Sequence, residues 1–527
     1  VNPGATGNSQ QITLHTPNLI LRGNSQLSAA TRGNGIAGDI LIRGTNSRES
    51  DQISIFNSTI STEVQNSGIA ANRTALMQMQ SGNNSDRQGD ITIETHSLVL
   101  DNNAQITAST NGRDRAGDIT IRGAEEVTLS DRSHISTEVN RRGVRRGGRI
   151  NIHTQTLSLD DQSRISARTR GQGRAGNIDV LATLVSLSQG SQLLTNTASS
   201  QNAGSITLTV TDRIVLDGQG SGIFASTQPG SRGRGGSITL HTTTLNLGSG
   251  AAISSASRGS DQAGNVRIQA TETLEADHGN ITTSATNAAG GAITITGGNI
   301  HLSDNSTIRT DVGRGTANGG NVTVTANDVR LRGNSDIQTR VAQGQGNGGD
   351  IVVQANSIIA FDDSDIISNA PNQGGDITLD TPVFFGSGYQ SDASADGNPD
   401  GNDRVDLDAS GAVSSGAVQT PNTDFIQNSL ADLAETVVDA DSLIANSCIV
   451  RTNEGGTFLI TGSGGLPPNR PGVAPLPPYP AGEVRTGNNE SETEQEHSSW
   501  QPGDAIVEPQ GVFRLTDGRL VMSRECQ

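Results

Sequence analysis

The sequence predicts an all-β protein, a right-handed parallel β-helix (solenoid) of about 13 coils followed by a mixed, partly disordered C-terminal segment. Three observations lead to this fold class. Segments led by glycine recur about every 28 residues, their apolar residues alternate with polar ones as in half-buried strands, and aromatic residues make up only 2% of the chain. This composition indicates a thin aliphatic core rather than several globular cores.

Each repeat opens on a glycine, one mostly polar residue and an apolar alternation, as in Gly89-Asp90-Ile91-Thr92-Ile93. From Gly89 onward the intervals between equivalent glycines are 28, 31, 28, 28, 32, 28, 27, 29, 29 and 26 residues. The copies begin at Gly38, Gly89, Gly117, Gly148, Gly176, Gly204, Gly236, Gly264, Gly291, Gly320, Gly349 and Gly375, with a weaker one at Gly7. The longer interval after Gly38 indicates an extra loop between residues 68 and 86, since insertions are tolerated in loops.

Three short strands make up one coil. After the first strand we expect a short polar turn and a second apolar segment, then a turn that usually ends in serine, and then a third strand built around an isoleucine. A loop rich in Gly, Arg, Asn and Gln leads to the next glycine. Alternation points these side chains of one coil inward: Ile91, Ile93, Leu98, Leu100 and Ile106. Stacking buries them and pairs each strand with its equivalents, and parallel crossovers are right-handed.

The domain organisation follows from where the repeats end. Residues 1–380 are predicted to form the β-helix, and residues 381–465 a segment that caps its open end, because an unpaired sheet edge promotes aggregation. Residues 466–503 form a Pro-rich and acidic linker. Residues 504–527 predict a terminal β-hairpin around a Thr-Asp-Gly turn.

Charge excludes several functions. The net charge is −18 and the chain has no lysine, which excludes Schiff-base chemistry and argues against binding to phosphate backbones. One stretch is locally basic, and we interpret it as a solvated loop because no aromatic residues are interleaved to stack bases. It contains Arg141, Arg142, Arg145, Arg146 and Arg149. No apolar run has the roughly 18 residues that a transmembrane helix needs.

Two pairs of carboxylates are the only motifs that suggest catalysis. A polysaccharide-cleaving enzyme needs clustered carboxylates, and Asp160-Asp161 and Asp362-Asp363 are such pairs. Both follow the second strand of a coil, where other coils place Asn, Gly, Gln or Ser, so we interpret them as turn formers. We therefore expect no catalytic residue and no cofactor, and predict that the protein is not an enzyme.

Two further features involve the C-terminal part of the chain. Asp396, Asn398 and Asp400 match the opening of a calcium loop, but its twelfth position is Leu407, where a bidentate Glu belongs. A polar loop is the favoured interpretation, and calcium binding is the alternative. The only two cysteines, Cys448 and Cys526, could form one disulfide.

The C-terminal region also carries a family likeness. Its segments are Val437–Ala440, Leu443–Ala445, Cys448, Phe458–Thr461, Gly464–Pro468 and the closing Pro509-Gln510-Gly511. Together with the repeats, these segments resemble filamentous haemagglutinin-type exoproteins of the two-partner secretion pathway. The tail is similar to the C-terminal region common in the cyanobacterial members of that group. The resemblance implies export through an outer-membrane β-barrel partner, a secreted or cell-surface location, and adhesion to a glycan or protein receptor. The N-terminal signal peptide and secretion domain of this family are not recognisable here, and we expect that an N-terminal portion precedes this chain.

The leading hypothesis is therefore a structural or adhesive exoprotein that presents loops on a rigid β-helix. The alternative is a lyase or hydrolase that acts on polysaccharides and has the same fold. An acidic cluster that lines one groove with arginine beside it would favour the enzyme. A polar groove without convergent carboxylates would favour the adhesin.

Overall fold

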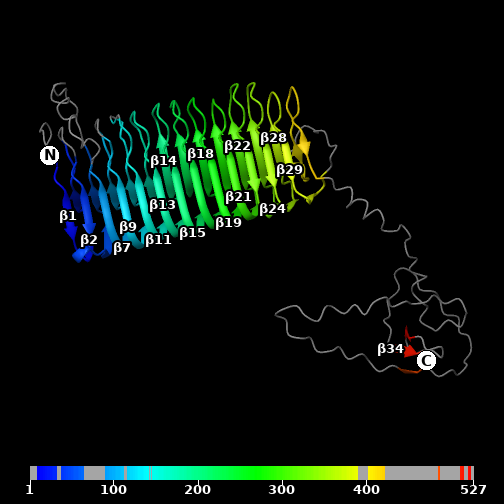
Figure 1. The fold of residues 1–527 in the computed structure, drawn as a ribbon, viewed down its shortest axis with the longest axis horizontal. Coiled ribbons are helices and arrows are strands. Elements are labelled where there is room, and N and C mark those ends of the chain that lie inside the picture. The colour runs from blue at the N-terminus through cyan, green and yellow to red at the C-terminus, as the bar shows by residue number, and fades with distance from the viewer. Residues whose placement is uncertain are drawn as a thin grey trace, which may run out of the picture. The chain divides into compact units, whose positions relative to one another are not determined.

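A computed structural model of the chain describes residues 9–32, 37–64, 89–111, 115–141, 143, 145–389 and 401–421, and the short strands 485–486, 511–514 and 520–523. The chain divides into two units, residues 1–423 and 424–527. The first unit is a parallel β-solenoid of about twelve turns, which confirms the predicted fold class. Figure 1 shows the strands of its successive coils side by side in chain order.

The first two faces of the solenoid belong to one 19-stranded sheet. In the middle coils one long strand covers both faces: β7 (Ile91–Asp101), β9 (Ile119–Leu129), β11 (Ile150–Leu159), β13 (Ile178–Leu187), β15 (Ile206–Asp217), β17 (Ile238–Gly248), β19 (Val266–Asp277) and β21 (Ile293–Ser303). In the outer coils the first face is formed by β1 (Ile12–His15), β4 (Ile40–Arg43), β23 (Val322–Thr325), β26 (Ile351–Gln354), β29 (Ile377–Asp380) and β32 (Val418–Gln419). The second face there is formed by β2 (Asn18–Leu21), β5 (Ser50–Phe56), β24 (Asp328–Leu331), β27 (Ser357–Ala360) and β30 (Phe384–Gly386).

The third face is a separate 13-stranded sheet with one strand from each coil. Its strands are β3 (Gln26–Ser28), β6 (Thr59–Ser61), β8 (Gln105–Thr107), β10 (His134–Ser136), β12 (Arg164–Ser166), β14 (Gln192–Thr197), β16 (Gly222–Thr227), β18 (Ala252–Ser257), β20 (Asn280–Ala285), β22 (Thr307–Val312), β25 (Asp336–Val341), β28 (Ile366–Asn369) and β31 (Leu407–Asp408). One short 3-10 helix, η1 (Thr45–Ser47), lies between β4 and β5.

The core is a continuous column of aliphatic side chains inside the three faces. All five side chains predicted to point inward from one coil are fully buried, namely Ile91, Ile93, Leu98, Leu100 and Ile106. In register, Ile91 lies between Ile40 and Ile119. Isoleucine therefore stacks on isoleucine from coil to coil, and alternation within each strand explains why the aliphatic core needs so few residues.

The corner between the first two faces differs from the prediction. We expected a short polar turn, but in the middle coils the strand continues through the corner with a shift of register. At several corners a threonine hydroxyl bonds to the carbonyl two residues later, both where the strand continues and where it is divided, as at Thr16 and Thr381. Thr95 Oγ1 donates to Ser97 O at 2.9 Å, and Thr154 Oγ1 donates to Thr156 O at the same distance.

Hydroxyl groups satisfy backbone atoms inside the stack. Thr310 Oγ1 donates to the carbonyl of Gly320 at 2.7 Å, and Thr339 Oγ1 donates to that of Gly349 at 2.7 Å. At the turn after the second face, the buried Ser335 Oγ accepts the N–H of Ser306 in the preceding coil at 3.1 Å. The serine that usually ends this turn thus links neighbouring coils, as buried backbone groups require partners.

The stack extends past residue 380, where we placed its end. The short strands β30, β31 and β32 pair in parallel with β27, β28 and β29. At the other end, the pairing of Ile12 with Ile40 places Gln10 opposite Gly38, so Gln10 and not Gly7 occupies the first glycine position. The predicted extra loop, residues 68–86, lies outside the described residues.

The second unit is described only in three strands. β34 (Gly511–Arg514) pairs antiparallel with β35 (Leu520–Ser523), which is the pairing of the hairpin expected here, and β33 (Arg485–Thr486) pairs with β34 in parallel. The remainder of the predicted cap and linker, residues 422–484 and 487–510, lies outside the described residues.

Candidate functional site

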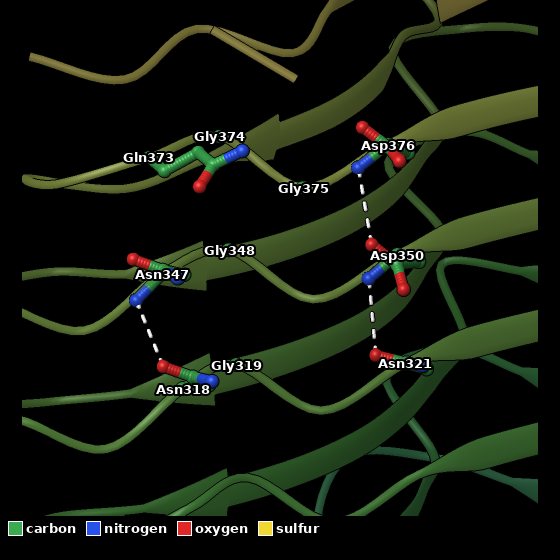
Figure 2. A pocket seen from close by; sticks show the side chains of 10 residues that line it. All are labelled: Asn318, Gly319, Asn321, Asn347, Gly348, Asp350, Gln373, Gly374, Gly375 and Asp376. Carbon is green, nitrogen blue, oxygen red and sulfur yellow. Dashed lines mark hydrogen bonds between the residues drawn. The ribbon is translucent and has the colours of Figure 1, made fainter. Parts of the chain in front are cut away.

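Where each loop meets the first face, the glycine that opens the repeat follows a second small residue in most coils, and these residues form a row along the stack that we name the glycine groove. In the coils from Asn318 to Asp376 this row is the floor of a pocket. Its glycine pairs include Gly319-Gly320, Gly348-Gly349 and Gly374-Gly375, and Figure 2 shows Gly319, Gly348, Gly374 and Gly375. The backbones are in direct contact, because Gly319 N donates to Asn347 O and Gly348 N donates to Gln373 O, each at 2.8 Å.

Close backbone contact explains why the repeat requires glycine. A Cβ added at Gly176 would lie 1.7 Å from the carbonyl oxygen of Gly148, and one added at Gly204 would lie 1.7 Å from that of Gly176. Neither glycine has the positive φ that glycine favours, so the requirement is one of space between coils. A floor without side chains follows directly from the stacking of coils.

Polar side chains form the two walls of the groove. In the coils of Figure 2 one wall consists of Asn318, Asn347 and Gln373, and the other of Asn321, Asp350 and Asp376, around a cavity of about 280 Å³. A wall residue that accepts a hydrogen bond from the backbone of the next coil uses only one side-chain oxygen for it. Asp350 Oδ1 accepts the N–H of Asp376 at 3.1 Å, and Asn321 Oδ1 accepts that of Asp350 at 3.0 Å. The amide groups and second carboxylate oxygens of the exposed wall residues remain available to a ligand.

The chemistry of the walls changes along the stack. Hydrogen bonds like those above place Arg115, Arg146 and Arg174 at the wall position that Asn318 and Asn347 hold later. Asp118 and Arg149 occupy the facing wall there. In the N-terminal coils one wall therefore carries arginines, and the facing wall carries Asp39, Asp90 and Asp118 before Arg149. Both walls carry amides or carboxylates in the coils of Figure 2.

The paired carboxylates singled out in the sequence lie in turns away from the glycine groove. Asp161 and Gln162 have φ of 50° and 59°, and Asp362 and Asp363 have φ of 54° and 59°. Asp160 O accepts the N–H of Ser163 at 3.2 Å. Two successive residues in the left-handed region make a tight turn that favours Asp and Asn. This geometry supports their interpretation as turn formers.

A second acidic feature was missed in the sequence. Asp336, Asp365 and Asp406 stack in adjacent coils of the third face, and all three are buried. Asp365 N donates to Asp336 Oδ1 at 2.9 Å, and Asp406 N donates to Asp365 Oδ1 at 2.8 Å. The Oδ2 atom of Asp365 is buried and has no hydrogen-bond partner among the described residues. The equivalent positions point outward in most other coils, so their burial could not be predicted from the alternation.

Burial controls the protonation of this stack. It raises the pKa of Asp365 to about 8, against the opposing effect of the hydrogen bond from Asp406, and the neighbouring Asp336 carboxylate adds to the increase. Asp365 is therefore neutral at pH 7. Arg404 pairs with Asp406, its Nε lying 2.9 Å from Oδ1. The acidic stack is closed to solvent, so a substrate has no access to it.

Three exposed side chains at neighbouring turns also come together. The ligand atoms of Asp277, His278 and Asp304 lie within 4.8 Å of one another. Of the predicted calcium ligands, Asp396, Asn398 and Asp400 lie outside the described residues, as do Cys448 and Cys526. Leu407 pairs with Ile366 in the third face, which accounts for a leucine where a calcium loop needs Glu.

The chain was compared with protein-family models, with curated proteins and with solved structures, and none of them matches it. Within the described ranges, no helix is long and apolar enough to span a bilayer.

Proposed function

We propose that this chain is a secreted or cell-surface adhesive exoprotein that is not an enzyme and that binds extended polymers along the glycine groove. The observation that carries the proposal is the groove itself, a floor without side chains between two rows of exposed hydrogen-bonding groups. The wall residues recur at each coil, which suits a ligand that is itself a repeating chain. Successive units of such a ligand can make the same contact in successive coils.

The scaffold supports this use. Each inner coil is bonded to the coil before and the coil after it on all three faces, so that wall residues are held at fixed intervals. A rigid presentation reduces the ordering cost of binding. Loops of different length enter the stack without disturbing this register, as the insertion between β4 and β5 does.

The enzyme alternative depends on convergent carboxylates. In the groove, Asp350 and Asp376 lie on the same wall, and one oxygen of each is bonded to the next coil. The other set, Asp336, Asp365 and Asp406 with Arg404 beside it, has the composition of an acidic site but is at most 8% exposed. General acid and base groups must reach the glycosidic oxygen. Incubation with polysaccharides should release no new reducing ends or unsaturated products, and their appearance would favour the alternative.

Export is the remaining part of the proposal and comes from the resemblance to two-partner exoproteins, which also implies an outer-membrane β-barrel partner. The test is protease treatment of intact cells that express the full gene. We expect the solenoid to be removed from the cell surface or found in the medium, while a cytoplasmic marker stays intact. Retention of the chain inside protease-treated cells would refute a surface role.

A further inference from the structure

Three arginines of successive coils form a row on one wall of the glycine groove. Ala116 N donates to Arg146 O at 3.3 Å, and Gly147 N donates to Arg174 O at 2.8 Å, so Arg115, Arg146 and Arg174 occupy equivalent positions one coil apart. Arg149 lies on the facing wall, where its N–H bonds to Asp118 Oδ1 at 2.6 Å. We call Arg115, Arg146, Arg149 and Arg174 the arginine row.

Most of the arginine row lacks an internal anion. Arg115 is paired with Asp118, at 2.6 Å between Nη2 and Oδ2. Across the described ranges, no carboxylate lies within 4.0 Å of the guanidinium of Arg146, Arg149 or Arg174, and all three side chains are exposed. Positive charge therefore gathers at one place in a chain whose net charge is −18.

The fold does not require these charges. In other coils the same wall position holds Arg234, whose Nε lies 3.6 Å from Asp261 Oδ1, or a neutral side chain, namely Asn202, Gln262, Ala289, Asn318, Asn347 and Gln373. Exposed arginines of adjacent coils repel each other, and salt screens this repulsion. Arg146, Arg149 and Arg174 have no carboxylate within 4.0 Å among the described residues, and like charges in adjacent coils without such a partner indicate an external anion.

We propose that the arginine row binds a linear anionic polysaccharide, one that carries carboxylates or sulfate esters, laid along the glycine groove across the coils that begin at Gly117, Gly148 and Gly176. The inference rests on the proposed function and names the class of its ligand. The rise of one coil is close to the length that one sugar contributes to an extended chain, so successive guanidinium groups meet successive sugars. Guanidinium binds carboxylate and sulfate through two parallel hydrogen bonds.

The surroundings favour a polysaccharide over a nucleic acid. Binding of single-stranded nucleic acid relies on aromatic side chains that stack on bases, and the sequence has no Phe, Tyr or Trp between Phe56 and Phe224. The floor of glycine and alanine lets a polymer approach the backbone closely, while the walls offer groups that bond to ring substituents. A duplex would also be repelled by the acidic remainder of the chain.

The test uses the full chain with polygalacturonate and dextran sulfate as probes and neutral dextran as the control ligand. We expect one or both anionic polymers to bind, with an affinity that falls as salt is raised. The double variant R146Q/R174Q should bind about tenfold or more weakly, since each lost charge-assisted contact contributes about 1.5 kcal/mol or more. Glutamine is a side chain that this wall position already holds, so folding should be retained.

The matched control is R213Q/R330Q, which makes the same charge change at exposed positions of β15 and β24 on the second face, away from the groove. Its affinity should stay within about twofold of the parent. Equal weakening by both double variants, undiminished binding by R146Q/R174Q, no binding to either anionic polymer, or tighter binding to duplex DNA or anionic vesicles would each overturn the inference. Surface exposure in the protease test is independent of all these results, so failure of this inference and failure of the proposed function are told apart.

Discussion

The buried acid Asp365 predicts an unusual dependence of stability on pH. Its folded pKa of about 8 lies above the ordinary value of 3.8. Between these values the native state keeps a proton that the unfolded state releases, so the unfolding free energy of the last coils should fall as pH rises from 4 to 8. Above pH 8 the group is ionised in both states and the loss is complete.

The size of this effect follows from the pKa difference. A difference of 8 − 3.8 = 4.2 pKa units corresponds to about 6 kcal/mol. Relaxation of the last coils around the ionised group reduces the effect, and we expect about 3 kcal/mol of it to be observed. Asp365→Asn should remove the loss, because Asn Oδ1 still accepts the N–H of Asp406 and its Nδ2 replaces the protonated oxygen.

The assay is amide hydrogen exchange of residues 366–380, measured for the variant and the parent at the same pH. Because intrinsic exchange rates cancel in the ratio, protection in Asp365→Asn should exceed that of the parent by about a hundredfold at pH 8.5 and by little at pH 4.5. The control is Asp376→Asn, where an exposed carboxylate that accepts the N–H of Ala417 is neutralised. Its effect should stay below about 0.5 kcal/mol. A ratio for Asp365→Asn that is the same at both pH values would refute a protonated Asp365.

Three further substitutions test the stack itself. Ile119→Asp places an unpaired charge at a fully buried position and should lower the unfolding free energy by about 4 kcal/mol or more, and a urea midpoint equal to that of the parent would contradict the inward assignment. Gly176→Ala puts a Cβ 1.7 Å from Gly148 O and should cost about 3 kcal/mol. Gly230→Ala, where a Cβ meets nothing within 4 Å but φ is 82°, should cost only about 1 kcal/mol, and equal losses would argue against the close-contact explanation. Thr310→Val removes the hydroxyl that bonds to Gly320 O and should cost about 1–3 kcal/mol in thermal unfolding, so an unchanged melting temperature would show that this bond is dispensable.

The sequence could predict the fold because its two strongest patterns are local. Alternation identified Ile91 and Leu98 as inward residues, and the spacing of Gly89 and its equivalents set the length of a coil. The role of the glycine could not be predicted in this way. Glycine before a strand usually indicates a turn, whereas at Gly176 it indicates a backbone contact with a residue 28 positions earlier, which is visible only once the coils are stacked.

The candidate site was harder to predict, because its residues also come together only once the coils are stacked. Arg146 and Arg149 belong to a stretch that we interpreted as a solvated loop, and they are indeed exposed. What the sequence could not show is that Arg174, in the following coil, lies directly beside Arg146. Asp365 was hidden in another way, because an outward position of the third face is covered there by residues 402–406 of the last coil.

These features share one physical cause. In this solenoid the inward isoleucines and the glycine floor fix the fold, whereas the wall positions two residues before and one residue after each opening glycine are free to vary. Gly148 and Gly349 have the same surroundings in the floor, but their coils place Arg146 and Asn347 at the same wall position. Because each coil is stabilised by its own core and its two neighbours, substitutions at the walls change the ligand chemistry without changing the stack. The arginine row is therefore one stretch of a surface whose wall residues differ from coil to coil while the stack beneath them stays the same.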